Sequence, residues 1–206
     1  TIDVIHNLSN IQLAALQLAG LGSAQLGALT TTQIVSLNST QLRSLSTAQV
    51  TALATDDIAA LTTAQMSSLG WWQVAALTAA QMQTLSSTQV LALNATQMHN
   101  LSIDQVAYLT AEEVRNLSTD QVAALQIGGL GNTQLGAMTA TQIVRLSSTQ
   151  LRSLSITQVA ALTTTEVAAL TTAQMRSLGW WQVAALTATQ MQALRSTQVL
   201  ALNATQ

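Results

Sequence analysis

Apolar and polar residues follow one another along the chain in a pattern that repeats every eight residues. Leucine occupies the first position of each eight-residue unit, which we call an octad, and an aliphatic residue or methionine occupies the sixth. Ser or Thr, two small polar residues and Gln fill positions two to five, and two mostly small residues end the octad. In the longest unbroken run the octads begin at Leu29, Leu37, Leu45, Leu53, Leu61, Leu69, Leu77, Leu85, Leu93, Leu101, Leu109, Leu117 and Leu125. A short period kept over most of a chain indicates a repeat architecture.

Each octad carries the sequence signals of a helix start. In residues 77–82, Thr78 stands at the N-cap, where its hydroxyl would accept a hydrogen bond from the backbone N–H of the third helical residue. Gln81 follows three residues later and can reach back to the Thr78 N–H, which completes a capping box. Leu77 and Met82 flank the box as a hydrophobic staple. The pattern therefore predicts one short helix per octad.

Two other structures are less consistent with the pattern. The Thr and Val content favours a β-solenoid with three octads in each 24-residue coil, but the apolar positions are three and five residues apart, which spoils strand alternation. The Ala-rich end of the octad also favours helix. One continuous helix is disfavoured because Ser and Thr pairs, which compete for the backbone, recur in every octad. Outside two irregular units, 20 of 22 octads carry Ser, Thr, Asn or Gly at the N-cap, with Ala54 and Arg195 as exceptions.

We therefore predict an all-α solenoid of short capped helices, one per octad. A single octad buries too little apolar surface to offset the entropy of ordering its backbone, so octads must stack on one another. Between Met66 and Val106 the sixth position alternates between Met and Val. This 16-residue rhythm predicts two helices per structural unit, with alternate helices stacked in separate layers.

The octads are themselves grouped into a longer repeat. Residues 1–97 align with residues 110–206 at an offset of 109, and 70 of the 97 pairs are identical. We interpret residues 1–206 as a single continuous repeat array and an excerpt from a longer one, with long repeats at 1–109 and 110–206, the second incomplete. A complete long repeat of 109 residues holds twelve octads and one 13-residue unit, and the 13-residue units lie at 16–28 and 125–137. These irregular units are rich in glycine, and we expect a bend, a longer helix or a register shift at Gly20, Gly22, Gly128, Gly129 and Gly131.

Composition excludes several classes of protein. Hydrophobic residues make up 49% of the chain, which is too many for a disordered segment. Only 7% of residues are charged, the net charge is −2, and all six basic residues are Arg, too sparse for a nucleic-acid surface. The chain has no Cys, and hence no disulfide framework, thiolate metal site or Cys nucleophile. No apolar run is long enough for a membrane span, and no signal peptide is visible.

The side chains that could carry chemistry are scattered. His6 and His99 lack a second metal ligand at a suitable spacing, and we expect both to be exposed to solvent. The carboxylate pairs at 56–57 and 112–113 fall at the second and third helical positions, where they complement the helix dipole and replace the capping Gln. The Gly-rich residues 125–132 lack the Lys of a phosphate-binding loop, so a role in backbone conformation fits them better. The sequence therefore predicts no catalytic, cofactor-binding or metal-binding residues and a protein that is not an enzyme.

Two tryptophan pairs depart from the pattern. Trp71, Trp72, Trp180 and Trp181 occupy the first two helical positions of their octads, where other octads carry Ser, Thr or Ala. These positions are expected to face away from the Leu and Val core. The aromatic rings could stack on sugar rings or fill a contact between chains, or they could pack over a neighbouring octad. Both interpretations remain open from the sequence.

The octad motif, as in residues 117–125 (LSTDQVAAL), resembles the octapeptide-repeat tracts of very large bacterial surface or secreted proteins. The resemblance covers essentially the whole chain and implies an extracellular or cell-surface location and a structural role. Our first hypothesis is a protein that associates with copies of itself into a surface fibre, adhesin stalk or matrix filament. The alternative is a polysaccharide-binding module that uses exposed tryptophan pairs, and a third hypothesis is an ice-binding solenoid. Neither nucleic acid nor a membrane is an expected partner.

Overall fold

The computed structural model describes residues 2–206, and their side chains from Val4 onward. The described chain forms α-helices α1–α24, each four to six residues long, and two 3-10 helices, η1 and η2. Each complete octad outside the irregular units forms one helix, which confirms the all-α prediction of short helices. The chain divides into two compact units, residues 1–100 and 101–206, which are described separately. Whether the whole chain is one continuous array stays a prediction.

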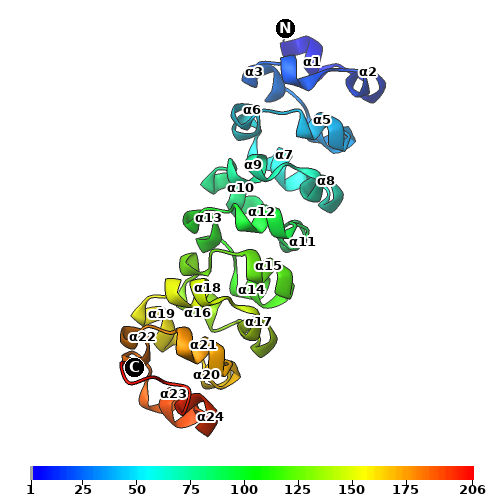
Figure 1. The fold of residues 1–206 in the computed structure, drawn as a ribbon. Helices are drawn as coiled ribbons and strands as arrows, with labels where there is room; N and C mark the ends of the chain where they lie inside the picture. Colours follow the sequence, from blue (N-terminus) through cyan, green and yellow to red (C-terminus); the bar gives the residue numbers. More distant parts are fainter. Residues whose placement is uncertain (1) are drawn as a thin grey trace. The chain divides into compact units, whose positions relative to one another are not determined.

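The first unit contains α1–α12 and η1 (Figure 1). The helices are α1 (Ile2–His6), α2 (Asn10–Ala14), η1 (Leu18–Gly20), α3 (Ser23–Leu26), α4 (Thr31–Ser36), α5 (Ser39–Arg43), α6 (Thr47–Ala52), α7 (Thr55–Ala60), α8 (Thr63–Ser68), α9 (Trp71–Ala75), α10 (Ala79–Thr84), α11 (Ser87–Leu91) and α12 (Ala95–His99).

The second unit contains α13–α24 and η2. The helices are α13 (Ile103–Ala107), α14 (Ala111–Asn116), α15 (Thr119–Ala124), η2 (Ile127–Gly129), α16 (Asn132–Leu135), α17 (Ala140–Arg145), α18 (Ser148–Ser153), α19 (Ile156–Ala161), α20 (Thr164–Ala169), α21 (Thr172–Ser177), α22 (Trp180–Ala184), α23 (Ala188–Ala193) and α24 (Ser196–Val199).

The helices begin and end where the sequence predicts. Before α10, Thr78 is extended, its hydroxyl accepts from the Gln81 backbone N–H at 3.2 Å, and the Gln81 side chain accepts from the Thr78 N–H at 2.9 Å. The helix ends at Leu85, whose backbone is again extended and whose side chain is buried. The exceptions behave as expected, because neither Ala54 nor Arg195 makes a side-chain cap hydrogen bond. One octad is thus one turn and a half of capped helix followed by an extended link.

Within each unit, helices pack against the third helix before or after them along the chain. In the first unit this produces three columns, α3–α6–α9–α12, α4–α7–α10 and α5–α8–α11 (Figure 1). In the second unit the columns are α13–η2–α18–α21–α24, α14–α16–α19–α22 and α15–α17–α20–α23. Three successive octads therefore form one layer of each stack.

The expected arrangement of two helices per structural unit is wrong. That prediction rested on the Met and Val alternation, but Met66 and Val74 are both completely buried in the same kind of position, at 0% exposure. The two side chains fill similar space in the core, so the alternation reports side-chain volume rather than layer membership. The octad leucines complete the core, as with Leu37 and Leu101 at 3% and 0% exposure.

Each irregular unit forms two short helices. Residues 16–28 contain η1 and α3, and residues 125–137 contain η2 and α16, so neither unit is a longer helix. When the 3-10 helix is counted, the rule of contact between every third helix continues through both units, as in η1 with α5 and η2 with α18. The contact between every third helix is therefore kept through both units, and the bend or register shift expected at the glycines stays a prediction.

Candidate functional site

The octad glutamine connects neighbouring layers of the stack. Gln73 has no exposed surface, and its Oε1 accepts from the Gly70 backbone N–H at 2.8 Å. Its Nε2 donates to the main-chain carbonyls of Leu42 and Leu45, at 2.7 and 2.9 Å, which lie at the end of α5 in the layer before. One buried amide thus caps its own helix and satisfies the free carbonyls at the end of another. We call the two bonds from Nε2 the glutamine latch.

The latch has a fixed spacing that explains the irregular units. Gln65 donates to Ile34 and Leu37, which lie 31 and 28 residues earlier, and the same two separations recur through the regular octads. Where an irregular unit intervenes, as for Gln41 with Leu13 and Leu16, the separations fall to 28 and 25. The difference of three residues equals two octads minus 13 residues. Each irregular unit is therefore a pair of octads shortened by three residues.

Only the capping half of this function could be predicted from the octad pattern. Glu and Gln serve equally in a capping box, yet almost every octad has the amide. The fifth octad position therefore prefers a side chain that can donate hydrogen bonds as well as accept them. This preference for Gln over Glu is the sequence signal of the latch. Asp57, Glu113 and Glu166 are the octad carboxylates that stand in its place, and Glu113 accepts from the Thr110 N–H at 2.7 Å as the capping prediction requires.

Glu166 shows what happens when a carboxylate replaces the amide. Its Oε2 accepts from the Thr163 N–H at 2.6 Å, while its Oε1 is buried without a hydrogen-bond partner among the described residues. By the latch spacing, this oxygen corresponds to an amide that would donate to the carbonyls of Leu135 and Met138. Burial raises the pKa of the Glu166 carboxyl above its ordinary value of 4.5, and hydrogen bonds from Thr163 oppose that shift. Burial likewise raises the pKa of Asp57, against the hydrogen bond from Ala54 and with a further rise from Asp56.

We expect Glu166→Gln to raise the free energy of unfolding by about 1–3 kcal/mol near pH 7, because the amide can complete the latch. The folded-state pKa of Glu166 lies above the unfolded one, so its ionisation destabilises the fold as the pH rises above 4.5. Below that pH the carboxyl is protonated in both states and the penalty disappears. The stability difference between variant and parent should therefore narrow on acidification, as measured by urea denaturation at about pH 7 and about pH 4.

Glu112→Gln is the matched control, since Glu112 is exposed and the same charge is removed without completing a latch. Its stability difference should stay small across this pH range. A Glu166→Gln difference that does not depend on pH would contradict the assignment.

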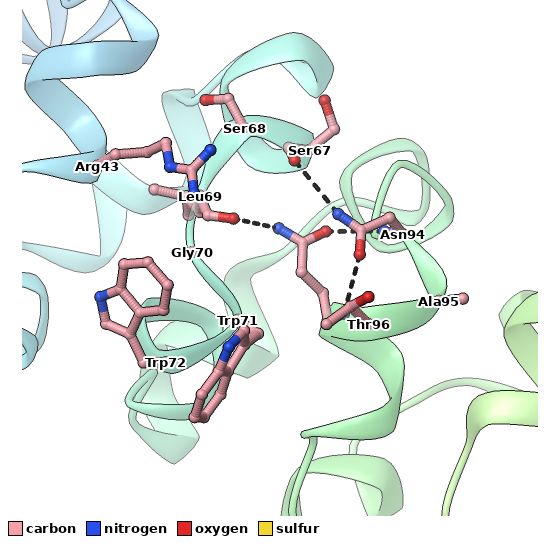
Figure 2. Close-up of a pocket in the computed structure, with 11 residues that line it drawn as sticks. Arg43, Ser67, Ser68, Leu69, Gly70, Trp71, Trp72, Asn94, Ala95 and Thr96 are labelled. Carbon is pink, nitrogen blue, oxygen red and sulfur yellow. Dashed lines mark hydrogen bonds between the residues drawn. The ribbon is translucent and has the colours of Figure 1, made fainter.

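The first tryptophan pair forms an aromatic corner beside a hollow (Figure 2). The rings of Trp71 and Trp72 meet edge to face, with centroids 5.9 Å apart and planes at 87°. Trp71 is 45% exposed and Trp72 37% exposed. The guanidinium carbon of Arg43, at the end of α5, lies 6.0 Å from the Trp72 ring centroid, within the range of a cation–π contact. The predicted outward position of the tryptophans is confirmed.

Gly70 lies directly against the Trp72 ring. A Cβ at this position would come within 2.5 Å of the indole, so the usual Ser or Thr cap would displace the ring. The same holds for Gly179 beneath Trp181. Both interpretations of the pair thus apply in part, because one ring of each pair folds back over its own helix cap while both rings keep exposed surface.

The second pair repeats this geometry with different neighbours. Trp180 and Trp181 meet at 6.0 Å and 86°, and they are 62% and 45% exposed. Arg152, the counterpart of Arg43 in the second long repeat, donates from Nε to the Ser177 carbonyl at 2.8 Å. The two corners therefore share the edge-to-face tryptophan pair and differ in the contact made by the arginine.

The remaining positions considered from the sequence are the two histidines and the glycines of the irregular units. His6 and His99 are exposed, as predicted, and the His6 Nδ1 lies 3.3 Å from the Ala28 carbonyl oxygen. None of the glycines in residues 2–206 has a positive φ, so none of them is required by a left-handed backbone, and the wider role in backbone conformation expected for residues 125–132 stays a prediction. At Gly129 the reason is close packing instead, since a Cβ would come within 2.5 Å of the Ile103 carbonyl oxygen. No helix within residues 2–206 combines the length and apolar character needed to cross a bilayer.

A comparison with known protein families finds a repeat family whose motif fits the octad pattern. The ALTTAQ repeat family matches residues 35–71, 52–87 and 143–172. The letters of that repeat occur unchanged at residues 60–65 and 169–174, which run from the end of one helix through the N-cap to the latch glutamine of the next. Residues 35–87 and 143–172 carry ALTTAQ repeats. In the structure, the six residues ALTTAQ supply the N-cap and the latch glutamine of one short helix, as at Gln65 and Gln174.

No curated protein and no solved structure matches the chain. The resemblance to octapeptide-repeat tracts is thus confirmed at the level of the ALTTAQ repeat. The link of these ALTTAQ repeats to bacterial surface or secreted proteins stays a prediction.

Proposed function

We propose that the chain is a non-enzymatic structural segment that associates with copies of itself into an extracellular fibre, stalk or matrix filament. The glutamine latch carries this proposal. In successive layers a buried amide such as Gln89 joins its own helix cap to main-chain carbonyls of the layer before, here Ile58 and Leu61 at 2.9 and 2.8 Å. A stack tied in this way resists separation of its layers, which suits a load-bearing segment.

The surface supports close association between copies. The chain has a net charge of −2, and the ion pair of the described residues, Arg145 with Asp120 at 3.6 Å, is largely exposed and adds little stability. Low charge reduces repulsion between copies. Isolated apolar side chains stand on this neutral surface, including Ile103 and Ile156 at 57% and 54% exposure. The 109-residue repetition also places near-identical surfaces at intervals along the chain, and repeated surfaces of one kind favour open, filamentous assembly.

The test is the state of association of the purified chain. Sedimentation velocity over a wide range of concentrations should show growing species, and negative-stain electron microscopy should show elongated assemblies. Monodisperse, non-associating particles at every concentration would contradict self-association.

A matched pair of variants locates the contact. Ile156→Thr introduces the residue that Thr47 supplies at the equivalent place in the first long repeat, so the fold should be kept while association weakens. Thr47→Ser at that equivalent place removes only one methyl group and should leave association unchanged. Equal behaviour of the two variants would exclude Ile156 from the contact.

A further inference from the structure

We propose that the aromatic corner of the first unit is a binding site for a sugar ring of an acidic polysaccharide, one whose units carry carboxylates. The site lies beside a hollow of about 470 Å³, formed by the end of α5, the end of α8 and the starts of α9 and α12 (Figure 2). Pockets for small ligands commonly fall between about 300 and 1,000 Å³.

The two indoles provide the apolar part of the site. Their planes stand at 87°, so one ring can lie beneath a sugar while the other stands beside it. A pyranose presents C–H groups on one face, and aromatic side chains with exposed surface suit such a ligand because they offer a rigid apolar area. Trp72 is held in place by Gly70 beneath it and by Arg43 beside it. The apolar area is therefore formed before a ligand arrives, which lowers the entropic cost of binding.

Arg43 determines the class of sugar. It is the only charged side chain that lines the hollow, and it forms no ion pair with a described carboxylate. A guanidinium can pair with a carboxylate through two parallel hydrogen bonds. The site therefore suits a uronic acid better than a neutral hexose.

Polar groups on the opposite side of the hollow can bind sugar hydroxyls. The Asn94 Nδ2 lies 3.5 Å from the Ser67 carbonyl, a long hydrogen bond that a ligand can replace. The Ser67 hydroxyl donates to the Ala64 carbonyl at 3.0 Å and keeps its capacity to accept. Both side chains line the hollow in Figure 2.

The shape of the corner favours a ligand over a second copy of the chain. Trp72 is folded onto Gly70 rather than projecting, and the corner forms one side of a concave surface. Two identical concave surfaces cannot fill each other. This assignment does not rest on the proposed fibre, for which the variant pair above tests a contact at Ile156.

The experiment measures binding of the full chain to polygalacturonate and to neutral dextran, by affinity electrophoresis and by tryptophan fluorescence. We expect retention by polygalacturonate, with a change in fluorescence. Trp71→Ala should weaken this retention roughly tenfold or more, since exposed aromatic residues of this kind dominate binding energies. Arg43→Gln should remove the preference for polygalacturonate over dextran.

Tyr108→Ala is the matched control, because Tyr108 is an exposed aromatic residue that does not line the hollow. It should leave retention unchanged. Absence of retention, retention that survives Trp71→Ala, or equal retention by both glycans would overturn the proposal.

Electron microscopy of Trp71→Ala separates this proposal from the proposed fibre. Assemblies that persist in the variant, together with lost retention, support a sugar site. Assemblies that disappear with Trp71 would assign the corner to contact between copies and overturn the sugar site. Assemblies absent from both proteins would contradict the fibre alone.

Discussion

Replacing Gln73 by Met should lower the free energy of unfolding by about 3 kcal/mol. Met fills nearly the same volume, so the core is kept and only the polar function is lost. The Gly70 N–H loses its acceptor, and the carbonyls of Leu42 and Leu45 lose the donors that lie at 2.7 and 2.9 Å. Each buried group left without a partner costs about 1–3 kcal/mol, while some of these groups relax toward other partners.

Urea denaturation followed by circular dichroism measures the total effect, and hydrogen exchange at the amides of α5 and α9 locates it. Gln83→Met is the control, because Gln83 is exposed and lies in the next octad. Its effect should stay within about 0.5 kcal/mol. Equal effects of the two substitutions would show that the latch contributes nothing to stability.

Gly129→Ala should destabilise the second unit by about 2–3 kcal/mol, the range expected for overpacking. The added Cβ would lie 2.5 Å from the Ile103 carbonyl oxygen and 3.1 Å from its Cα. Both are main-chain atoms, so the clash cannot be relieved by rotating a side chain. The contact between η2 and α13 must open instead.

Gly136→Ala is the control within the same irregular unit. The nearest atom to a Cβ there is the Asn132 carbonyl oxygen at 3.5 Å, an ordinary van der Waals contact, and φ is not positive. This substitution should be neutral or stabilise by up to about 1 kcal/mol, because Ala restricts the unfolded chain. The two variants should therefore differ clearly in thermal denaturation. A cost at Gly136 equal to that at Gly129 would contradict close packing as the reason.

The sequence predicts the helices well because their signals are local. The N-cap, the capping Gln and the flanking apolar pair all lie within six residues, as in residues 77–82, and the structure contains each of these contacts. The outward position of the tryptophans follows from the same local frame. The number of columns does not, because it depends on which octads meet, and octads that differ only by Met or Val are interchangeable in the core.

In the candidate sites, too, local features could be predicted from the sequence and contacts between distant residues could not. The capping role of Gln81 could be predicted, but its bonds to Val50 and Leu53 join residues 31 and 28 positions apart. No local pattern specifies such a separation. Gly70 could be recognised as an N-cap, while its role as the surface beneath Trp72 depends on a side-chain rotamer. Arg43 reaches the corner from an octad that precedes it by four, so only the fold brings them together.

The latch has a further consequence for how such a chain changes during evolution. Its donors bind main-chain carbonyls, which every residue possesses, so no particular side chain is needed on the receiving octad. Duplication or loss of one octad therefore changes the partner only of the few glutamines that follow it directly, and their new octads are equally able to receive them. Recombination between near-identical coding repeats can lengthen or shorten the array by whole octads without compensating substitutions. The irregular units, each two octads shortened by three residues, also keep the latch.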